Sequence, residues 1–183
     1  MVPRLLKIAL ILVCLCSTVA DAKVGSTLGF FNLTSKNSAG TSTLSNLGHV
    51  KMFYDFPVLD RFNIRPSYSL YLLGIDTNDI GYGFDFEFSY FPFSFNRSMR
   101  LGQKNLNFVS SERIRPYIGA SFHQRQYQSI QSNYAGVGGT IGAHLQFTPD
   151  YHFIAGLSVL GLKGPLSSSI TEQQLYFGAS LNL

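Results

Sequence analysis

Large apolar residues alternate strictly with small or acidic ones between Ile80 and Phe91. Ile, Tyr and Phe take every second position, while glycines, Asp85, Glu87 and Ser89 take the positions between them. A period of two residues is that of a β-strand, whose side chains point alternately to its two faces. Bulky apolar residues on one face, and glycines and acids on the other, favour a strand with lipid outside and a tight polar interior.

Seven other segments repeat this alternation less strictly, each over about ten residues, which is typical of membrane barrel strands. They are 24–32, 47–56, 64–73, 114–125, 134–147, 151–160 and 171–183. With 80–91 they form an even set, which can close with both chain ends on the same side. Closure is required in hydrocarbon, because a sheet edge would leave backbone N–H and C=O groups unpaired. The predicted fold is all-β: an eight-stranded antiparallel transmembrane β-barrel of up-and-down topology, over residues 23–183.

The segments between these strands differ in length and composition. If the N-terminus is periplasmic, four polar segments form outward loops: 34–45, 74–79, 125–133 and 161–169. Residues 55–63 and Thr148–Asp150 read as turns. The long connection 92–113 mixes basic residues (Arg97, Arg100, Lys104) with Phe, Met and Leu. We interpret it as an irregular connector; lying along the inner membrane–water boundary and contacting a partner are the alternatives.

The first residues, 1–22, have the pattern of a signal peptide. Arg4 and Lys7 precede an apolar run from Ile8 to Ala20, which is too short to span a bilayer. Ala20-Asp21-Ala22 has the small residues that signal peptidase requires, so we expect cleavage between Ala22 and Lys23. Both cysteines lie in this segment, so the mature chain would contain neither a disulfide nor a thiol nucleophile.

Charge and composition add little chemistry. The formal net charge is +4 and charged residues make up 13% of the chain, with the basic ones scattered. Nucleic-acid binding normally shows a basic stripe, so no nucleic-acid partner is expected. No cofactor is implied, and no His, Cys or Asp spacing approaches a metal-ligand set.

The predicted inner faces carry charged residues. An eight-stranded barrel is just wide enough to be filled by its own side chains, so these charges should pair: Arg65, Asp85, Glu87, Arg115 and Glu172, with Lys51 and the histidines. Arg65 and Arg115 open the strands that flank the one carrying Glu87. We therefore predict an ionic cluster of these three residues near the periplasmic end. Charge compensation in the core is its preferred role, and a gated narrow conduit is the alternative.

A short repeat supports a family resemblance. Ile64-Arg65-Pro66 and Ile114-Arg115-Pro116 each open a strand after a predicted turn. With the glycine-rich strand 136–147 and the alternating C-terminal strand, they resemble the OmpA/OmpX-like barrel domain, the small eight-stranded outer-membrane β-barrel family. The chain departs from it by ending in Leu183, where such barrels usually carry an aromatic residue. The resemblance implies a porin-like protein of a Gram-negative outer membrane. Its partners would be outer-membrane lipid, lipopolysaccharide and the barrel-assembly machinery during insertion.

Two rival functions are weighed against the barrel's expected structural or surface-interaction role, in which outward loops would contact a surface ligand. A lipid A-modifying enzyme would place a His and a Ser close together, but the four histidines lie on separate strands without a serine two residues further on: His49, His123, His144 and His152. A soluble lipocalin-like barrel needs an apolar lumen. Aromatic residues near strand ends instead suggest a membrane-interface girdle: Tyr54, Phe56, Tyr90, Phe91, Phe93, Phe147 and Tyr151. We expect no catalytic site.

Overall fold

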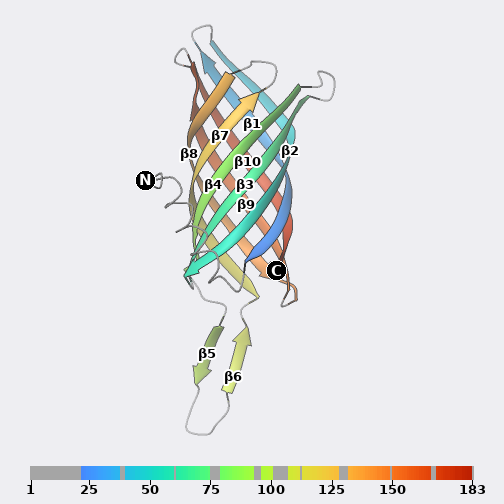
Figure 1. Cartoon of the computed structure of the whole chain (residues 1–183), viewed down its shortest axis with the longest axis vertical. Coiled ribbons are helices and arrows are strands. Elements are labelled where there is room, and N and C mark those ends of the chain that lie inside the picture. Colours follow the sequence, from blue (N-terminus) through green and yellow to red (C-terminus); the bar gives the residue numbers. More distant parts are fainter. Residues whose placement is uncertain are drawn as a thin grey trace, which may run out of the picture.

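Eight antiparallel strands close into one barrel, in which the strands follow chain order and β1 pairs with β10 (Figure 1). A computed structural model describes residues 22–37, 40–59, 61–74, 79–92, 96–100, 107–111, 113–127, 132–148, 150–165 and 168–182. The barrel strands are β1 (Lys23–Asn37), β2 (Gly40–Leu59), β3 (Phe62–Gly74), β4 (Asp79–Tyr90), β7 (Ile114–Tyr127), β8 (Ser132–Gln146), β9 (Tyr151–Lys163) and β10 (Ser169–Asn182). The eight-stranded up-and-down barrel predicted from the alternation is confirmed.

The strands are strongly staggered around the barrel. A row of paired residues that leaves β1 at Lys36 and passes through every neighbouring strand returns to β1 at Ser26, ten positions earlier. Stagger and strand tilt are linked in a closed sheet, and this stagger corresponds to a tilt of roughly 40° from the barrel axis. Rows of paired residues therefore climb around the wall instead of lying level.

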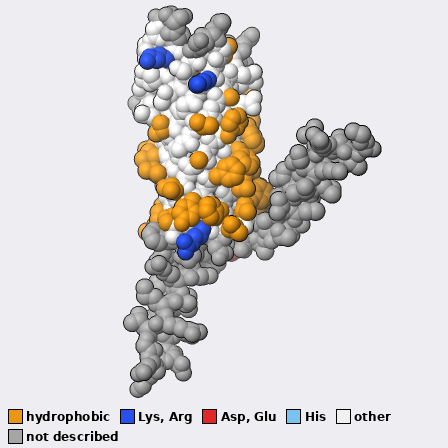
Figure 2. Space-filling model, turned by 90° about the vertical axis from the view of Figure 1, so that its left-hand side faces the viewer, with side chains coloured by type: hydrophobic (Ala, Val, Ile, Leu, Met, Phe, Trp, Pro, Cys, Tyr) orange, Lys and Arg blue, Asp and Glu red, His pale blue; other side chains and the backbone are white. Residues whose placement is uncertain are grey.

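The alternation places side chains as the sequence predicts. On β4 the side chains of Asp85 and Glu87 are buried in the lumen, while Phe84 and Phe88 are about half exposed on the outer surface. Figure 2 shows the consequence on one side of the molecule: apolar side chains gather on the lower part of the wall. A wall that is apolar outside and ionic inside is the arrangement of a membrane barrel. In the part of the chain that the structure describes, no helix is long and apolar enough to cross a membrane.

The barrel has two different ends. At one end, called the turn end, lie the first residue of β1, the last of β10 and the connections β2–β3 and β8–β9. At the other, called the loop end, lie the connections β1–β2, β3–β4, β7–β8 and β9–β10. The predicted signal peptide, apart from Ala22, lies outside the described residues, so its cleavage at Ala22–Lys23 stays a prediction.

The loop predicted for 34–45 is wrong. The strands β1 and β2 stay paired as far as Asn37 and Gly40, with one irregularity between Phe31 and Leu33. Residues 40–45 are Ser-, Thr- and Gly-rich and are exposed, so they lack the apolar face from which a membrane strand is recognised. Backbone pairing continues where the alternation stops. The connections 55–63 and 161–169 are likewise shortened by strand ends at Leu59, Phe62 and Lys163.

The connector 92–113 is not irregular throughout, which corrects its interpretation. It contains a two-stranded hairpin of β5 (Asn96–Arg100) and β6 (Asn107–Ser111), which Figure 1 shows beyond the turn end of the barrel. Strands of five residues are too short to display a convincing period.

Candidate functional site: the filled barrel interior

The lumen is filled by four layers of side chains, whose order can be followed along β3 and β7. From the turn end, β3 presents Arg65 and then, three inward positions later, Tyr71. On β7, Tyr117 precedes Arg125, and Tyr127 follows it. Ionic and aromatic side chains thus alternate along the barrel axis. We call the two charged layers the Arg65 cluster and the Asp85 cluster.

The Arg65 cluster, nearer the turn end, consists of one cation between two acids. The guanidinium of Arg65 donates from Nη2 to Asp55 Oδ2 at 3.0 Å and from Nη1 to Glu87 Oε1 at 3.4 Å. Nη2 also lies 2.9 Å from His144 Nε2, so this ring nitrogen accepts. All four side chains are buried. A buried arginine with two carboxylates compensates charge that the lumen could not hold unpaired.

The Asp85 cluster is centred on an acid, Asp85, instead of a cation. Asp85 accepts from Lys51 Nζ at 3.0 Å, and its other oxygen contacts Arg125. Arg125 Nε also lies 3.6 Å from Glu172 Oε2. Glu172 accepts from Gln174 at 2.9 Å and from the hydroxyl of Tyr127. This layer therefore holds two acids, Asp85 and Glu172, and two basic residues, Lys51 and Arg125.

An aromatic layer separates the two clusters. Phe53, Ile154 and Tyr176 pack together, and the hydroxyls of Tyr117 and Tyr176 lie 2.7 Å apart. Inward glycines on the neighbouring strands make room for these rings: a Cβ on Gly142 would lie 2.7 Å from the Tyr117 ring. The volume that a side chain would occupy at these inner-face glycines is thus filled by large side chains of neighbouring strands.

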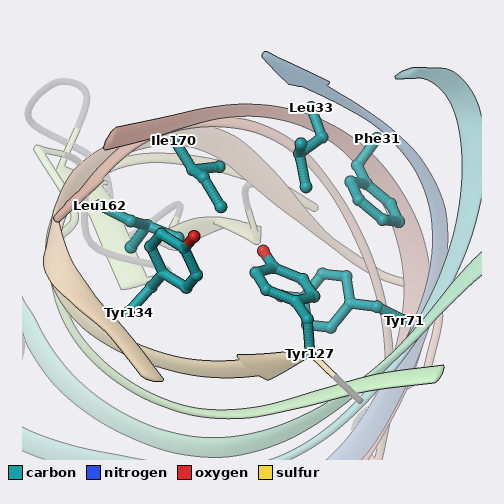
Figure 3. Close-up of a cluster of buried hydrophobic side chains, with 7 residues drawn as sticks. All are labelled: Phe31, Leu33, Tyr71, Tyr127, Tyr134, Leu162 and Ile170. Carbon is teal, nitrogen blue, oxygen red and sulfur yellow. The ribbon is translucent and has the colours of Figure 1, made fainter. Parts of the chain in front are cut away.

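A second apolar layer, called the outer plug, closes the lumen on the loop side of the Asp85 cluster. Its members are Phe31, Leu33, Tyr71, Tyr127, Tyr134, Leu162 and Ile170. Figure 3 shows these side chains pointing inward from several strands and meeting in the lumen. Each is at most 6% exposed, so water has no wide path past them.

Cation–aromatic contacts join the layers. The guanidinium of Arg65 lies 4.8 Å from the ring centre of Phe53, and that of Arg125 lies 4.8 Å from the ring centre of Tyr71. Lys51 Nζ lies 5.7 Å from the ring centre of Tyr176. Such contacts are favourable within about 6 Å and are stronger when desolvated. Each cation therefore has a carboxylate in its own layer and an aromatic ring in the next.

Four of the five charged residues singled out from the sequence are divided between these layers. Arg65 and Glu87 lie in the Arg65 cluster, and Asp85 and Glu172 lie in the Asp85 cluster. The structure places Arg115 elsewhere: its guanidinium lies 4.2 Å from the ring centre of Phe91, at the turn end. Phe91 is fully buried in this opening, so its assignment to the membrane-interface girdle is wrong. Phe91 has the same inward phase as Asp85 and Glu87 on β4, and its backbone N–H donates to Arg61 O.

Asp55 is the member of the Arg65 cluster that the sequence did not single out. It has the same inward phase as His49 and Lys51 on β2, which is the signal that places it in the lumen. The β2–β3 register pairs Phe53 with Ser67 and Phe56 with Ile64, which sets Asp55 opposite Arg65 on the neighbouring strand. The sequence analysis did not assign this register, so it did not predict the pair.

One chain of hydrogen bonds has the connectivity of a hydrolytic triad. His123 Nδ1 lies 2.8 Å from Asp85 Oδ1, and His123 Nε2 lies 2.6 Å from Ser121 Oγ. The serine stands two residues before the histidine, the reverse of the order searched for in the sequence. Arg125 and Lys51 also bind this carboxylate, and all three members of the chain are buried. A nucleophile needs an approach for its substrate, and the outer plug and the aromatic layer lie on either side.

Among the described residues, no group of three or more His, Cys, Asp or Glu side chains could hold a metal ion.

Comparisons with known proteins bear on the fold. No model of a known protein family matches the chain, and no curated protein matches its sequence. Among solved structures, neisserial surface protein A (NspA) matches 88% of this chain and 97% of its own, with TM-score 0.63 and 12% identity. The N-terminal β-barrel domain of Pseudomonas aeruginosa OprF matches 87% of this chain and 97% of its own, with TM-score 0.50 and 13% identity. OprG, an outer membrane protein of the same organism, matches 89% and 97%, with TM-score 0.50 and 9% identity.

Identities this low bear on the fold alone. The chain has the fold of small eight-stranded outer-membrane β-barrels, which confirms the fold that the OmpA/OmpX-like resemblance implied. This fold and the apolar exterior together indicate the outer membrane.

Proposed function

We propose that the protein is a sealed outer-membrane barrel with a structural or surface-interaction role, which neither conducts ions freely nor catalyses a reaction. The observation that carries this proposal is the filled lumen. Two apolar layers lie across it, and the charges of the two ionic clusters are engaged with one another. A pore would need a continuous polar path, and an enzyme would need an open cleft.

We place the turn end on the periplasmic side, because β1 begins and β10 ends there and the chain would then enter and leave the barrel from the periplasm. The loop end then faces the exterior. The paired strands β1 and β2 run on past the apolar belt at this end, so the exposed Ser and Thr side chains of residues 40–45 become a surface for contacts outside the cell.

The rival functions gain less support. A lipocalin-like carrier would turn its apolar side chains inward, whereas Phe84, Phe122 and Phe177 are about half exposed on the outer surface. The Ser121–His123–Asp85 chain offers an enzyme the connectivity of a triad without an approach. We assign it to the packing of the lumen.

Electrophoretic mobility and membrane conductance test the proposal together. The barrel from outer-membrane fractions should migrate differently unheated and boiled in detergent, because a closed membrane barrel resists cold detergent. In planar bilayers it should show no steady conductance. A variant with Tyr127→Ala and Leu162→Ala, which thins the outer plug, supplies the comparison. Steady channels in the unsubstituted protein would refute a sealed lumen, and recovery in the soluble fraction without a mobility shift would refute the membrane assignment.

A further inference from the structure

The outer surface of β1, β10 and β9 changes character in steps toward the loop end. The last fully apolar row contains Phe30, Leu175 and Leu157, which are register partners on the three strands. Two residues further along each strand the row is Asn32, Gln173 and Val159, and the next is Thr34, Thr171 and Gly161. The row after that is Lys36, Ser169 and Lys163. We call these last three rows the polar wall.

The steps have the order of a lipid–water boundary. On β1, apolar side chains give way to an amide, then a hydroxyl, then an ammonium group; β10 follows with an amide and two hydroxyls, and β9 passes from Val159 through Gly161 to Lys163. Lys36 lies six positions beyond Phe30, which is roughly 20 Å along a strand and about 15 Å along the membrane normal at the barrel's tilt. This depth corresponds to the sugar headgroups above the outer leaflet's acyl chains.

The charge of the polar wall has one sign. Lys36 and Lys163 are both exposed and are separated by one strand, hence by about 10 Å across the sheet. No described Asp or Glu side chain faces outward on this wall: Glu172 of β10 is buried in the lumen. Figure 2 shows such a surface, white with isolated blue side chains above the apolar belt.

The opposite side of the barrel does not share this pattern. On β3 and β4 the outer surface stays apolar toward the loop end, where Leu72, Ile80 and Tyr82 are 51%, 40% and 38% exposed. Outward amides also occur toward the loop end on β7 and β8, at Gln124, Gln126 and Asn133, so among the described residues it is the pair of exposed lysines that distinguishes the wall of β1, β10 and β9.

We propose that the polar wall is a docking site for an outer-leaflet glycolipid with a phosphorylated sugar headgroup. The acyl chains would lie on Phe30, Leu175 and Leu157, the sugar amides and hydroxyls on the Asn, Gln and Thr rows, and the phosphates at Lys36 and Lys163. Lysine is a suitable phosphate partner because its compact charge needs no fixed geometry. This inference rests on the proposed outer-membrane location, and it names where and how the lipid is recognised.

The test compares two pairs of charge removals. Lys36→Gln with Lys163→Gln removes both ammonium groups of the wall. Arg61→Gln with Arg113→Gln removes the same charge from two exposed residues at the turn end. Each folded barrel is titrated in neutral detergent with bisphosphorylated lipid A, with the same lipid after removal of its phosphates, and with phosphatidylglycerol. Bound lipid is counted by native mass spectrometry.

Bisphosphorylated lipid A should bind the lysine variant on the order of tenfold more weakly than the unsubstituted barrel, since each basic residue near an anionic lipid surface contributes modestly. The arginine variant should bind it normally, and loss of the phosphates should abolish the difference. Equal binding by all three proteins would overturn the docking site, and so would an equal loss of phosphatidylglycerol binding. All three should keep the mobility shift on boiling, and its absence in the unsubstituted protein would refute the membrane proposal itself.

Discussion

The two ionic clusters of the lumen both compensate buried charge, but with opposite arrangements. In the Arg65 cluster a single cation holds two acids, Asp55 and Glu87. In the Asp85 cluster the central acid, Asp85, holds two cations, Lys51 and Arg125, and Glu172 adds a longer contact of 3.6 Å to Arg125. A carboxylate that loses its partner can take up a proton and become neutral, whereas an arginine cannot lose its charge. The cluster centred on the acid should therefore tolerate the loss of its centre less well.

Asp85→Asn should have the largest effect, because it leaves Lys51 and Arg125 without their shared carboxylate in the lumen. Removing one partner of a buried ion pair costs about 3–5 kcal/mol of the free energy of unfolding. Urea unfolding in detergent micelles, followed by the cold-gel mobility of the folded barrel, measures it. Ser158→Ala is the control: it removes one neutral hydroxyl contact to Thr140 at 2.9 Å and should cost about 1 kcal/mol. An equal loss in both variants would mean that the charges of the Asp85 cluster are unimportant.

Arg65→Met should come next, at about 3 kcal/mol near neutral pH, because Asp55 and Glu87 then face each other without a cation. The pH dependence of its stability should distinguish this variant from Asp85→Asn. Protonation of the abandoned carboxyls should restore part of the stability as the pH falls from 8 to 5, relative to the unsubstituted barrel. Asp85→Asn should show no such recovery, since Arg125 keeps its charge. Parallel pH profiles for the two variants would remove the distinction between the clusters.

Glu87→Ala should cost less, about 1–2 kcal/mol, because Arg65 keeps its shorter contact with Asp55. Ser89→Ala is the matched control: its hydroxyl donates to Glu87 Oε1 at 2.6 Å, so it removes one neutral contact from the same carboxylate. Thermal unfolding in the same micelles compares them. Unchanged stability of Glu87→Ala would argue that Glu87 is not part of a functioning ion-pair cluster.

Period-two alternation was enough to predict the barrel, its strand number and the inward position of every charged residue considered. Those properties depend only on which face of a strand a side chain occupies. Contacts across the lumen depend on stagger and on the heights of the strands, which no local pattern records. The register of β2 against β3, which sets Asp55 opposite Arg65, was likewise not assigned from the sequence. Phe91 was placed in the girdle as an aromatic residue at a strand end, although it has the inward phase of Asp85 and Glu87. Strand ends outside the lipid were missed for a related reason, since the Ser- and Thr-rich residues 40–45 have no apolar face to reveal them.

Arg115→Gln should have the smallest effect on the free energy of unfolding, and it tests whether this residue contacts Phe91 or Glu87. The sequence predicted that it shares Glu87 with Arg65, but its guanidinium lies over the Phe91 ring at 4.2 Å and the residue is partly exposed. A partly exposed cation–aromatic contact is worth about 0.5–1 kcal/mol, so the variant should lose no more than this free energy of unfolding in urea.

A double-mutant cycle then separates the two assignments of Arg115, to the Phe91 ring or to Glu87. The effects of Arg115→Gln and Glu87→Ala should add, whereas those of Arg65→Met and Glu87→Ala should not, because only residues in one network couple. If Arg115 couples to Glu87 as strongly as Arg65 does, all three residues belong to one cluster. The contact with Phe91 would then contribute nothing to the role of Arg115.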